Sequence, residues 1–523
     1  MGIKGFGIKN QDNILTALVY LLCIVTAVWV VETKDDYETD EIFTYGLSNH
    51  QYADTTEMRV VEGQKYEPAG TAWYDYMVVQ PGEGFDYANV WKKQAEDVHP
   101  VLYYAIVHTI SSFFPGQFSR WFAGIVNLIF FVMTLYVVRK IVYELTRDNR
   151  AVLAASVCFS LCGGNVVALG LFRMYIMAMF FVTLLTWLLM RFYKEGADKR
   201  LCLQLGIASV LGALTHYYVT VYLVLACVVC GFLLPAKKKR RAFARLAGCM
   251  AAAAAGAVLI FPAMLRHFFV SDRGKQSVEG LVENSIQTYV DDLHDYGEFI
   301  NDYIFGGILW LILLALAALL MMKRIRLPEQ RLPVEEGLIL IVPSILYFLL
   351  IARIAVYNTD RYIQPIYGVV AAAGICGLYL IIHSLTQGRM ANLLMLAAVV
   401  GMVVSSWFNA KLISLGDDAA DGEEPIDYAE YDALYVYHDE ELWRIQASFW
   451  KLKDCKSITF ISDDGFDLLY ESGILENEEL LVIIQDRIDD QDFYLASVTG
   501  LGPKLETYEE ADHDGYATVY YLN

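Results

Sequence analysis

The sequence predicts a mainly α membrane protein with about 11 transmembrane helices, one re-entrant or interfacial helix, and a small C-terminal extracytoplasmic α/β domain. Its 523 residues are 56% hydrophobic and only 19% charged, with a mean hydropathy of +0.39, whereas a soluble protein carries about 25% charged residues. From Asn409 to the end the chain holds 28 acidic and 7 basic residues, so the first 408 residues are nearly neutral. A tail this acidic would repel phosphates, which excludes a nucleic-acid partner.

The membrane body is predicted from apolar runs, because crossing a bilayer core of about 30 Å takes about 20 mostly apolar residues. The runs lie at 14–31, 119–141, 151–171, 174–193, 201–215, 217–235, 244–266, 304–322, 334–352, 362–383 and 390–408. Basic clusters between them, such as KKKRR at 237–241, favour the cytoplasmic side. We therefore expect a multi-pass protein of the cell membrane with a cytoplasmic N-terminus and an extracytoplasmic C-terminal domain.

The division of the chain follows from this path. Residues 1–408 are expected to form the membrane domain, with outer loops at 32–98 and 267–303, and residues 409–523 the acidic α/β domain. The segment 101–114 is apolar but too short for an ordinary span, so it predicts the re-entrant or interfacial helix. In the tail, β-rich and helical runs alternate, as in a small α/β domain. The β-rich runs are 433–437, 457–462, 480–485 and 517–522, and the helical runs are 441–452 and 466–471.

Unusual polar side chains fall on the outer side of this topology. They occur in TDEIFTYGLSNH, EDVHPVLYYAIVH, LFRMYIMA, LTHYYVT and NTDRYIQPIY, and they are Asp40, Glu41, Asp97, His99, Arg173, Tyr175, His216, Tyr217, Arg361 and Tyr362. Charged groups at membrane depth are costly and by default mark a functional cavity. Taken singly, an arginine could snorkel to phosphates and a tyrosine could belong to an interface belt. The five motifs together indicate a site, because all of them are expected on the outer side of the membrane.

This set of side chains suits one kind of reaction. A carboxylate just above the membrane can act as general base on an acceptor hydroxyl. Cationic groups can stabilise an anionic leaving group, and aromatic rings can stack on a sugar. Arg173, His216 and Arg361 are expected in one pocket for a leaving phosphate, with Arg361 favoured because Asp360 and Tyr362 flank it. The combination predicts glycosyl transfer from a lipid-linked phosphosugar.

The same motifs, in order and spacing over about residues 10–370, resemble the GT-C superfamily of multispan membrane glycosyltransferases. They are similar to the protein O-mannosyltransferase and aminoarabinose-transferase group and its bacterial relatives. The resemblance implies an outward-facing cavity, a polyprenyl- or dolichyl-phosphate sugar donor, inversion at the anomeric carbon, and Asp40 as the catalytic carboxylate beside Glu41. It matches His99 and Pro100 to a His-Pro motif. The mannosyltransferases continue His-Pro-Pro-Leu-Gly-Lys, whereas this chain reads His-Pro-Val-Leu-Tyr-Tyr, which leaves the sugar and acceptor open.

The expected function is therefore an inverting membrane glycosyltransferase, of hexosyl or pentosyl type. It would move a sugar from a polyprenyl-phosphate donor to a glycan, lipid or protein acceptor of the cell envelope. The alternative is a transporter or flippase of a lipid-linked sugar, which should show internal repeats and broken helices. A sensor or scaffold would leave Asp40 and Glu41 without a role. Whether a divalent cation such as Mg²⁺ or Mn²⁺ takes part stays open; its candidate oxygen ligands are Asp35, Asp36, Glu38, Asp40 and Glu41.

Overall fold

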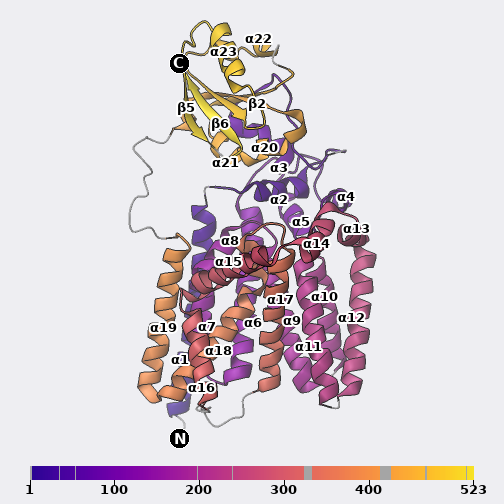
Figure 1. Ribbon diagram of the computed structural model, residues 1–523, viewed down its shortest axis with the longest axis vertical. Coiled ribbons are helices and arrows are strands. Elements are labelled where there is room, and N and C mark those ends of the chain that lie inside the picture. Colours follow the sequence, from indigo (N-terminus) through magenta and orange to yellow (C-terminus); the bar gives the residue numbers. More distant parts are fainter. Residues whose placement is uncertain are drawn as a thin grey trace. The chain divides into compact units, whose positions relative to one another are not determined.

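The computed structural model (Figure 1) describes residues 3–34, 36–53, 55–196, 198–237, 239–322, 325, 333–412, 426–465, 468–513 and 515–523. The chain divides into two compact units. The membrane unit comprises Met1–Thr33, Val98–Tyr103 and Ala123–Asp417. The α/β unit comprises Lys34–Asp97, Tyr104–Phe122 and Asp418–Asn523.

Helices of the membrane unit run side by side in a bundle (Figure 1). Eight helices of the described residues are long and apolar enough to cross a membrane. They are α1 (Ile3–Thr33), α6 (Trp121–Thr146), α9 (Tyr175–Glu195), α11 (Tyr217–Ala236), α12 (Arg240–Ile260), α17 (Val334–Ile354), α18 (Tyr367–Leu385) and α19 (Gly388–Asn409). Bent pairs α7–α8 (Asn149–Leu161 and Gly163–Gly170, 47°) and α15–α16 (Ile286–Phe305 and Leu309–Met321, 91°) raise the number to ten if each is one span.

The predicted mainly α membrane fold is confirmed, and a helix lies at each of the eleven apolar runs, but the count of eleven spans is not. The run at 201–215 forms α10 (Lys199–Ala213), which has only 15 residues. It is therefore shorter than the eight helices that can cross a membrane. Shorter helices complete the unit: α13 (Ala263–Phe269), α14 (Asp272–Glu283), η2 (Asp360–Tyr362) and η3 (Gln364–Ile366). Lys238, in the KKKRR cluster, lies outside the described residues.

The bend between α7 and α8 has a packing cause. Cys162 between them is extended, and Gly163 then begins α8 with its N–H donating to Ser406 Oγ of α19 at 2.9 Å. A Cβ on Gly163 would lie 2.3 Å from the Ser406 carbonyl oxygen. Only glycine therefore lets α8 approach the backbone of α19 so closely.

The α/β unit is built on a six-stranded sheet of order β1-β3-β2-β4-β6-β5. The strands are β1 (Lys65–Tyr66), β2 (Asp432–Tyr437), β3 (Ser457–Ser462), β4 (Leu480–Gln485), β5 (Tyr508–His513) and β6 (Ala517–Leu522). β3, β2 and β4 are parallel, while β1, β6 and β5 pair antiparallel. All four predicted strands are confirmed; β1 and β5 were not predicted, because one is two residues long and the other is largely acidic.

Short helices connect the strands. They are η4 (Tyr428–Glu430), η5 (Asp439–Glu441), α20 (Trp443–Ala447), α21 (Phe449–Leu452), α22 (Leu469–Ser472), η7 (Ile474–Glu476) and α23 (Gln491–Leu501). The helical run expected at 441–452 is thus broken into short pieces. Of the run expected at 466–471, residues 466 and 467 lie outside the described residues.

The first loop belongs to the sheet rather than to the membrane helices, so the domain boundary differs from the one expected. β1 pairs with β3, and Trp73 Nε1 donates to the Ile445 carbonyl at 3.2 Å. Glu62 Oε1 accepts from the Ser462 N–H at 2.8 Å. Trp73 is fully buried, with its ring 5.3 Å from Phe449 and 5.9 Å from Phe460. Residues 34–97 and the tail therefore share one core.

Helices of the first loop contribute to this unit: α2 (Thr39–Asn49), η1 (Ala69–Trp73), α3 (Tyr74–Met77) and α4 (Tyr87–Glu96). After the loop comes α5 (Leu102–Ser111), of which residues 104–111 belong to the same unit. The C-terminal half of α2 is buried, and Asn49 Nδ2 donates to the Met77 carbonyl at 2.7 Å. α5 occupies the segment 101–114, and its ten residues extend only about 15 Å. It is too short to cross a bilayer, in accord with a re-entrant or interfacial helix.

Replacing Gly46 of α2 with alanine should destabilise the protein. A Cβ there would lie 1.9 Å from Cε1 of the fully buried Tyr76 ring, whose hydroxyl is held by the Thr56 carbonyl at 2.7 Å. We expect Gly46→Ala to cost about 1–3 kcal/mol through overpacking, seen as a lower apparent Tm of the purified protein. Gly401→Ala in α19 is the matched control, because no atom lies within 4 Å of its new Cβ. Equal Tm values for both variants would contradict the packing argument.

Candidate active site

The ends of several membrane helices bring predicted site residues together. Arg173, in the turn between α8 and α9, is only 2% exposed, and its Nη2 lies 3.5 Å from His99 Nε2. His216 caps the N-terminus of α11, where its Nδ1 accepts from the Tyr218 N–H at 3.1 Å. The His216 ring lies 6.2 Å from His99 and 5.3 Å from Tyr175. These side chains come from three separate parts of the membrane unit.

A tyrosine extends this group to the next predicted pair. The Tyr218 ring lies 4.8 Å from His216 and 5.4 Å from Tyr362, and the Arg361 guanidinium carbon is 5.7 Å from the Tyr362 ring centroid. Six of the eight predicted substrate-binding residues thus form a continuous group, which we call the Arg173 cluster. Its predicted members are His99, Arg173, Tyr175, His216, Arg361 and Tyr362. Tyr218 also lies in the motif LTHYYVT, but the sequence predicted its neighbour Tyr217 as the binding residue.

The other two predicted substrate-binding residues lie elsewhere. The Tyr217 hydroxyl is 2.6 Å from His267 Nδ1, and its ring packs on Phe268 at 4.6 Å. Successive residues at a helix start point in different directions, which separates Tyr217 from Tyr218. Asp97 belongs to the α/β unit, where it ends α4 with its N–H donating to the Lys93 carbonyl at 2.9 Å.

Asn127 of α6 positions the cluster and was not predicted. Its Oδ1 accepts from the Tyr103 hydroxyl at 3.0 Å, and its Nδ2 donates to the carbonyls of Leu169 and Leu171 at 3.1 and 2.8 Å. The first bond ties α6 to the segment that carries His99, and the others tie it to the turn that carries Arg173. The signal in the sequence is an amide within the apolar run 119–141, since such amides bond across membrane helices.

The cluster combines two guanidinium groups with imidazole and phenol side chains. Burial, and then the neighbouring His99 and Arg173, hold the pKa of His216 well below its ordinary value, so His216 is neutral near pH 7. Burial raises the pKa of Asp360, which accepts from Gln364 Nε2 at 3.2 Å. A buried guanidinium beside neutral imidazole and phenol groups suits an anion with several acceptor oxygens.

The two predicted catalytic carboxylates, in the α/β unit, have different surroundings. Glu41 is fully buried; its Oε2 accepts from the Glu38 N–H at 2.9 Å and lies 3.0 Å from Lys34 Nζ. These bonds form a capping box that fixes the start of α2. Asp40 is half-buried in the first turn of the same helix. The geometry therefore gives Glu41 a structural task at the start of α2.

The expected cation ligands do not form a ready site. Asp35 lies outside the described residues, and the Asp36 side chain is 75% exposed. Glu38 is exposed, while Glu41 is engaged with Lys34. Within the described part of the chain, no group of three or more His, Cys, Asp or Glu side chains is arranged to hold a metal ion.

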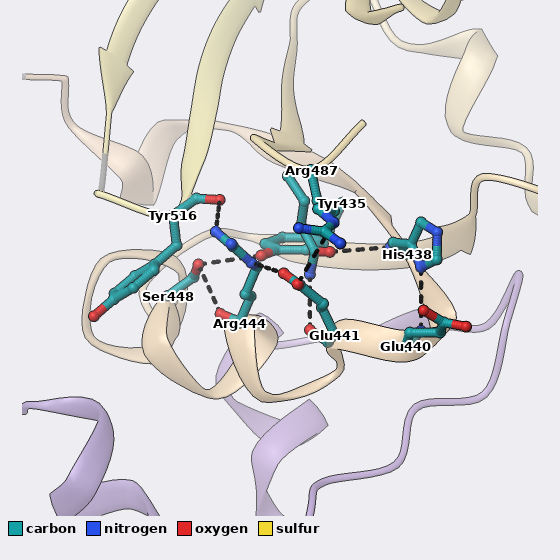
Figure 2. Close-up of polar contacts among 9 residues, drawn as sticks. Tyr435, His438, Glu440, Glu441, Arg444, Ser448, Arg487 and Tyr516 are labelled. Carbon is teal, nitrogen blue, oxygen red and sulfur yellow. Dashed lines mark hydrogen bonds and ion pairs between the residues drawn. The ribbon is translucent and has the colours of Figure 1, made fainter. Parts of the chain in front are cut away.

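A polar network ties the loops at the carboxyl ends of β2 and β4. Figure 2 shows Glu441 between Arg444 and Arg487, with Arg444 also donating to the Tyr516 carbonyl at 3.1 Å. The His438 N–H donates to Gln485 Oε1 at 3.0 Å. In parallel sheets such loops often bind ligands, but here their charged groups bond one another. The network therefore joins three strands of the sheet and suggests no reaction.

Comparisons with known proteins agree with the fold. No family model and no curated protein matches the chain. It is similar to the crystal structure of ArnT from Cupriavidus metallidurans bound to undecaprenyl phosphate, with 11% identity, a TM-score of 0.51, and coverage of 99% of this chain and 98% of that one. The apo ArnT structure matches at 10% identity and a TM-score of 0.50, over 98% of both chains. The apo oligosaccharyltransferase of Archaeoglobus fulgidus matches at 12% identity and a TM-score of 0.47, over 96% of this chain and 70% of that one.

The chain therefore has the fold of ArnT, and its long apolar helices are those of a multi-pass membrane protein. The likeness to ArnT extends over nearly the whole length of both chains.

Removing the amide of Asn127 should destabilise the membrane unit. Asn127→Leu removes the hydrogen bonds that the buried amide makes to the Tyr103 hydroxyl and to two carbonyls, and each lost hydrogen bond typically costs about 0.5–1.5 kcal/mol. We expect a clear fall in the apparent Tm of the purified protein. Asn392→Leu in α19 is the control, since it removes one exposed bond from Arg150. A Tm for Asn127→Leu no lower than the control would remove Asn127 from its positioning role.

Proposed function

We propose that this protein is an inverting membrane glycosyltransferase that moves one sugar from a polyprenyl-phosphate donor to an acceptor of the cell envelope. The observation that carries the proposal is the Arg173 cluster, a buried cationic group at helix ends in a chain with the GT-C fold. Undecaprenyl phosphate bound to the similarly folded ArnT supports this class of donor. We further propose that the N-terminus is cytoplasmic and that the α/β unit and the reaction are extracytoplasmic.

The cluster serves the donor. As the bond between the anomeric carbon and the phosphate oxygen breaks, its electron pair stays with the phosphate, which gains negative charge. The Arg173 guanidinium can donate paired, charge-assisted hydrogen bonds to that anion. His99 and the neutral His216 add further polar contacts. Tyr175, together with Tyr218 and Tyr362, offers ring faces on which the lipid or sugar can pack.

Asp40 serves the acceptor. Its carboxylate takes the proton of an acceptor hydroxyl, so that the hydroxyl oxygen can attack the anomeric carbon. Attack from the face opposite the leaving phosphate inverts the configuration there. The proposal assigns Asp40 this role because Glu41 is engaged in the capping box and the ion pair to Lys34. Mass spectrometry of the envelope products would identify the acceptor class (glycan, lipid or protein) and the sugar, hexose or pentose.

One observation favours the alternative, a transporter or flippase of a lipid-linked sugar. Transporters bind their substrates at broken helices, and the membrane unit contains two bent pairs, α7–α8 and α15–α16. The fold and the Arg173 cluster favour transfer more strongly. Mass spectrometry of envelope glycans and lipid-linked sugars, from cells with and without the protein, separates the two. Loss of a transferase removes one sugar residue from a final product. Loss of a transporter instead leaves the donor lipid on the side of the membrane where it is made.

Asp40→Asn should abolish transfer without preventing membrane insertion. The change keeps the side-chain volume but removes the base, which costs about 10²–10⁴-fold in rate. The same mass spectrometry should show the sugar missing from cells that make only this variant. Asp36→Asn is the matched control, because Asp36 is largely exposed and lies 3.7 Å from Lys34, a pair worth little energy. Normal glycan from the Asp40→Asn strain would exclude Asp40 as the base.

Arg173→Lys should impair transfer more than Arg361→Lys. Lysine keeps the charge but loses the planar fork that binds phosphate through two bonds. Arg173 is 2% exposed and lies beside His99, whereas Arg361 is half-buried and joins the cluster through Tyr362. We expect Arg173→Lys to lower turnover by about tenfold or more, which is about 1.4 kcal/mol, and Arg361→Lys by less. If turnover is unchanged in Arg173→Lys, the guanidinium serves only as an anchor.

A further inference from the structure

A groove lies between α10 and α12 at the lipid-facing side of the membrane unit, apart from the Arg173 cluster. Its volume is about 720 Å³, and its walls are mainly apolar, including Leu203, Ile207 and Val210 of α10 and Ala252 of α12. Leu203 and Ile207 are 63% and 52% exposed. Only 17% of the apolar window of α12 is buried. The groove is therefore a hydrocarbon-facing surface rather than an internal cavity.

The two helices leave this groove open because their facing residues are small. A Cβ on Gly206 of α10 would meet only Cys249 Sγ of α12, at 3.6 Å. The run 251–255 of α12 consists of alanines, whose short side chains do not fill the space beside α10. The thiol of Cys249 donates to the Cys202 carbonyl at 3.0 Å and fixes the spacing of the two helices.

One end of the groove is strongly basic. A second cavity of about 680 Å³ shares Arg245 with the groove, and together they are lined by six cations and one carboxylate. The cations are Lys194, Lys199, Lys239, Arg240, Arg241 and Arg245. The carboxylate, Glu195, is already held by Arg191 through two bonds of 2.9 and 2.8 Å. Lys194 is also paired, with Glu144 at 2.7 Å, but the lining itself carries six cations against one carboxylate.

We propose that the groove binds an anionic phospholipid, with one acyl chain along α10 and the phosphate between Lys199 and Arg245. Lys199 and Leu211 both line the groove, and their separation along the helix is about 18 Å, close to the half-thickness of a bilayer core of about 30 Å. Basic pockets between membrane helices bind anionic head groups. The site is independent of the proposed transfer reaction, because His216 follows the opposite end of α10.

The test uses the full-length protein in phosphatidylcholine nanodiscs, with phosphatidylglycerol added and binding followed by native mass spectrometry and thermal shift. Phosphatidylglycerol should bind and raise the apparent Tm, whereas more phosphatidylcholine should not. The double variant Lys199→Gln/Arg245→Gln should bind phosphatidylglycerol about tenfold to thirtyfold more weakly. Lys140→Gln/Arg389→Gln is the matched control, because both residues are exposed and line neither cavity. Ala252→Phe should also weaken binding, because it fills the apolar part of the groove and leaves the cations in place.

Several results would overturn the proposal. Equal binding of the two lipids, or undiminished phosphatidylglycerol affinity in Lys199→Gln/Arg245→Gln, would remove the charge recognition. Equal binding of soluble glycerol phosphate would reduce the groove to a plain anion site. Loss of a dimer in the variant, with lipid binding intact, would make this face a contact between copies. If the double variant unfolds, phosphatidylglycerol binding by the wild type and by Ala252→Phe tests the proposal instead. A wild-type affinity for phosphatidylglycerol that does not fall from low to high salt would contradict a phosphate site.

Discussion

The constraint on which the membrane unit depends is the cost of burying the Arg173 guanidinium. A charge held away from water at membrane depth is tolerated only where polar groups surround it. Arg173 is 2% exposed and meets His99, while Asn127 fixes both the turn that carries Arg173 and the segment that carries His99. Three chain segments are thus ordered around one buried cation. Such expensive positioning is typical of a site that binds an anion.

In the α/β unit the constraint is different, because its polar groups must be held in place next to water. The first outer loop obtains its rigidity from the tail: Trp73 bonds Ile445, β1 pairs with β3, and Glu62 bonds Ser462. The capping box of Glu41 then fixes the first turn of α2, on which Asp40 lies. The acidic tail therefore has a clear physical task, to complete the core on which the loop folds. This explains why a chain with a mainly membrane composition carries a separate sheet.

Two kinds of basic residue also become distinguishable. Basic residues at the ends of α10 and α12 lie at the surface, beside an apolar groove of about 720 Å³, whereas Arg173 is enclosed by protein. In the first case the positive charge faces lipid, and in the second it faces a closed cluster of aromatic rings. Basic residues of the same charge can therefore have different roles, which depend on their burial and on the groups around them.

Hydropathy and local pattern were enough to predict the membrane class, the positions of the eleven apolar helices and four of the six strands. These depend on hydropathy, period and motif order, which are local properties of the chain. Three features could be seen only in the folded protein. Tyr218 rather than Tyr217 joins the Arg173 cluster, Glu41 caps a helix, and residues 34–97 fold with the tail. Those outcomes depend on side-chain direction and on partners as distant as Trp73 and Ile445. No pattern within one segment encodes such contacts, because burial and hydrogen bonding are settled by the segments that pack together.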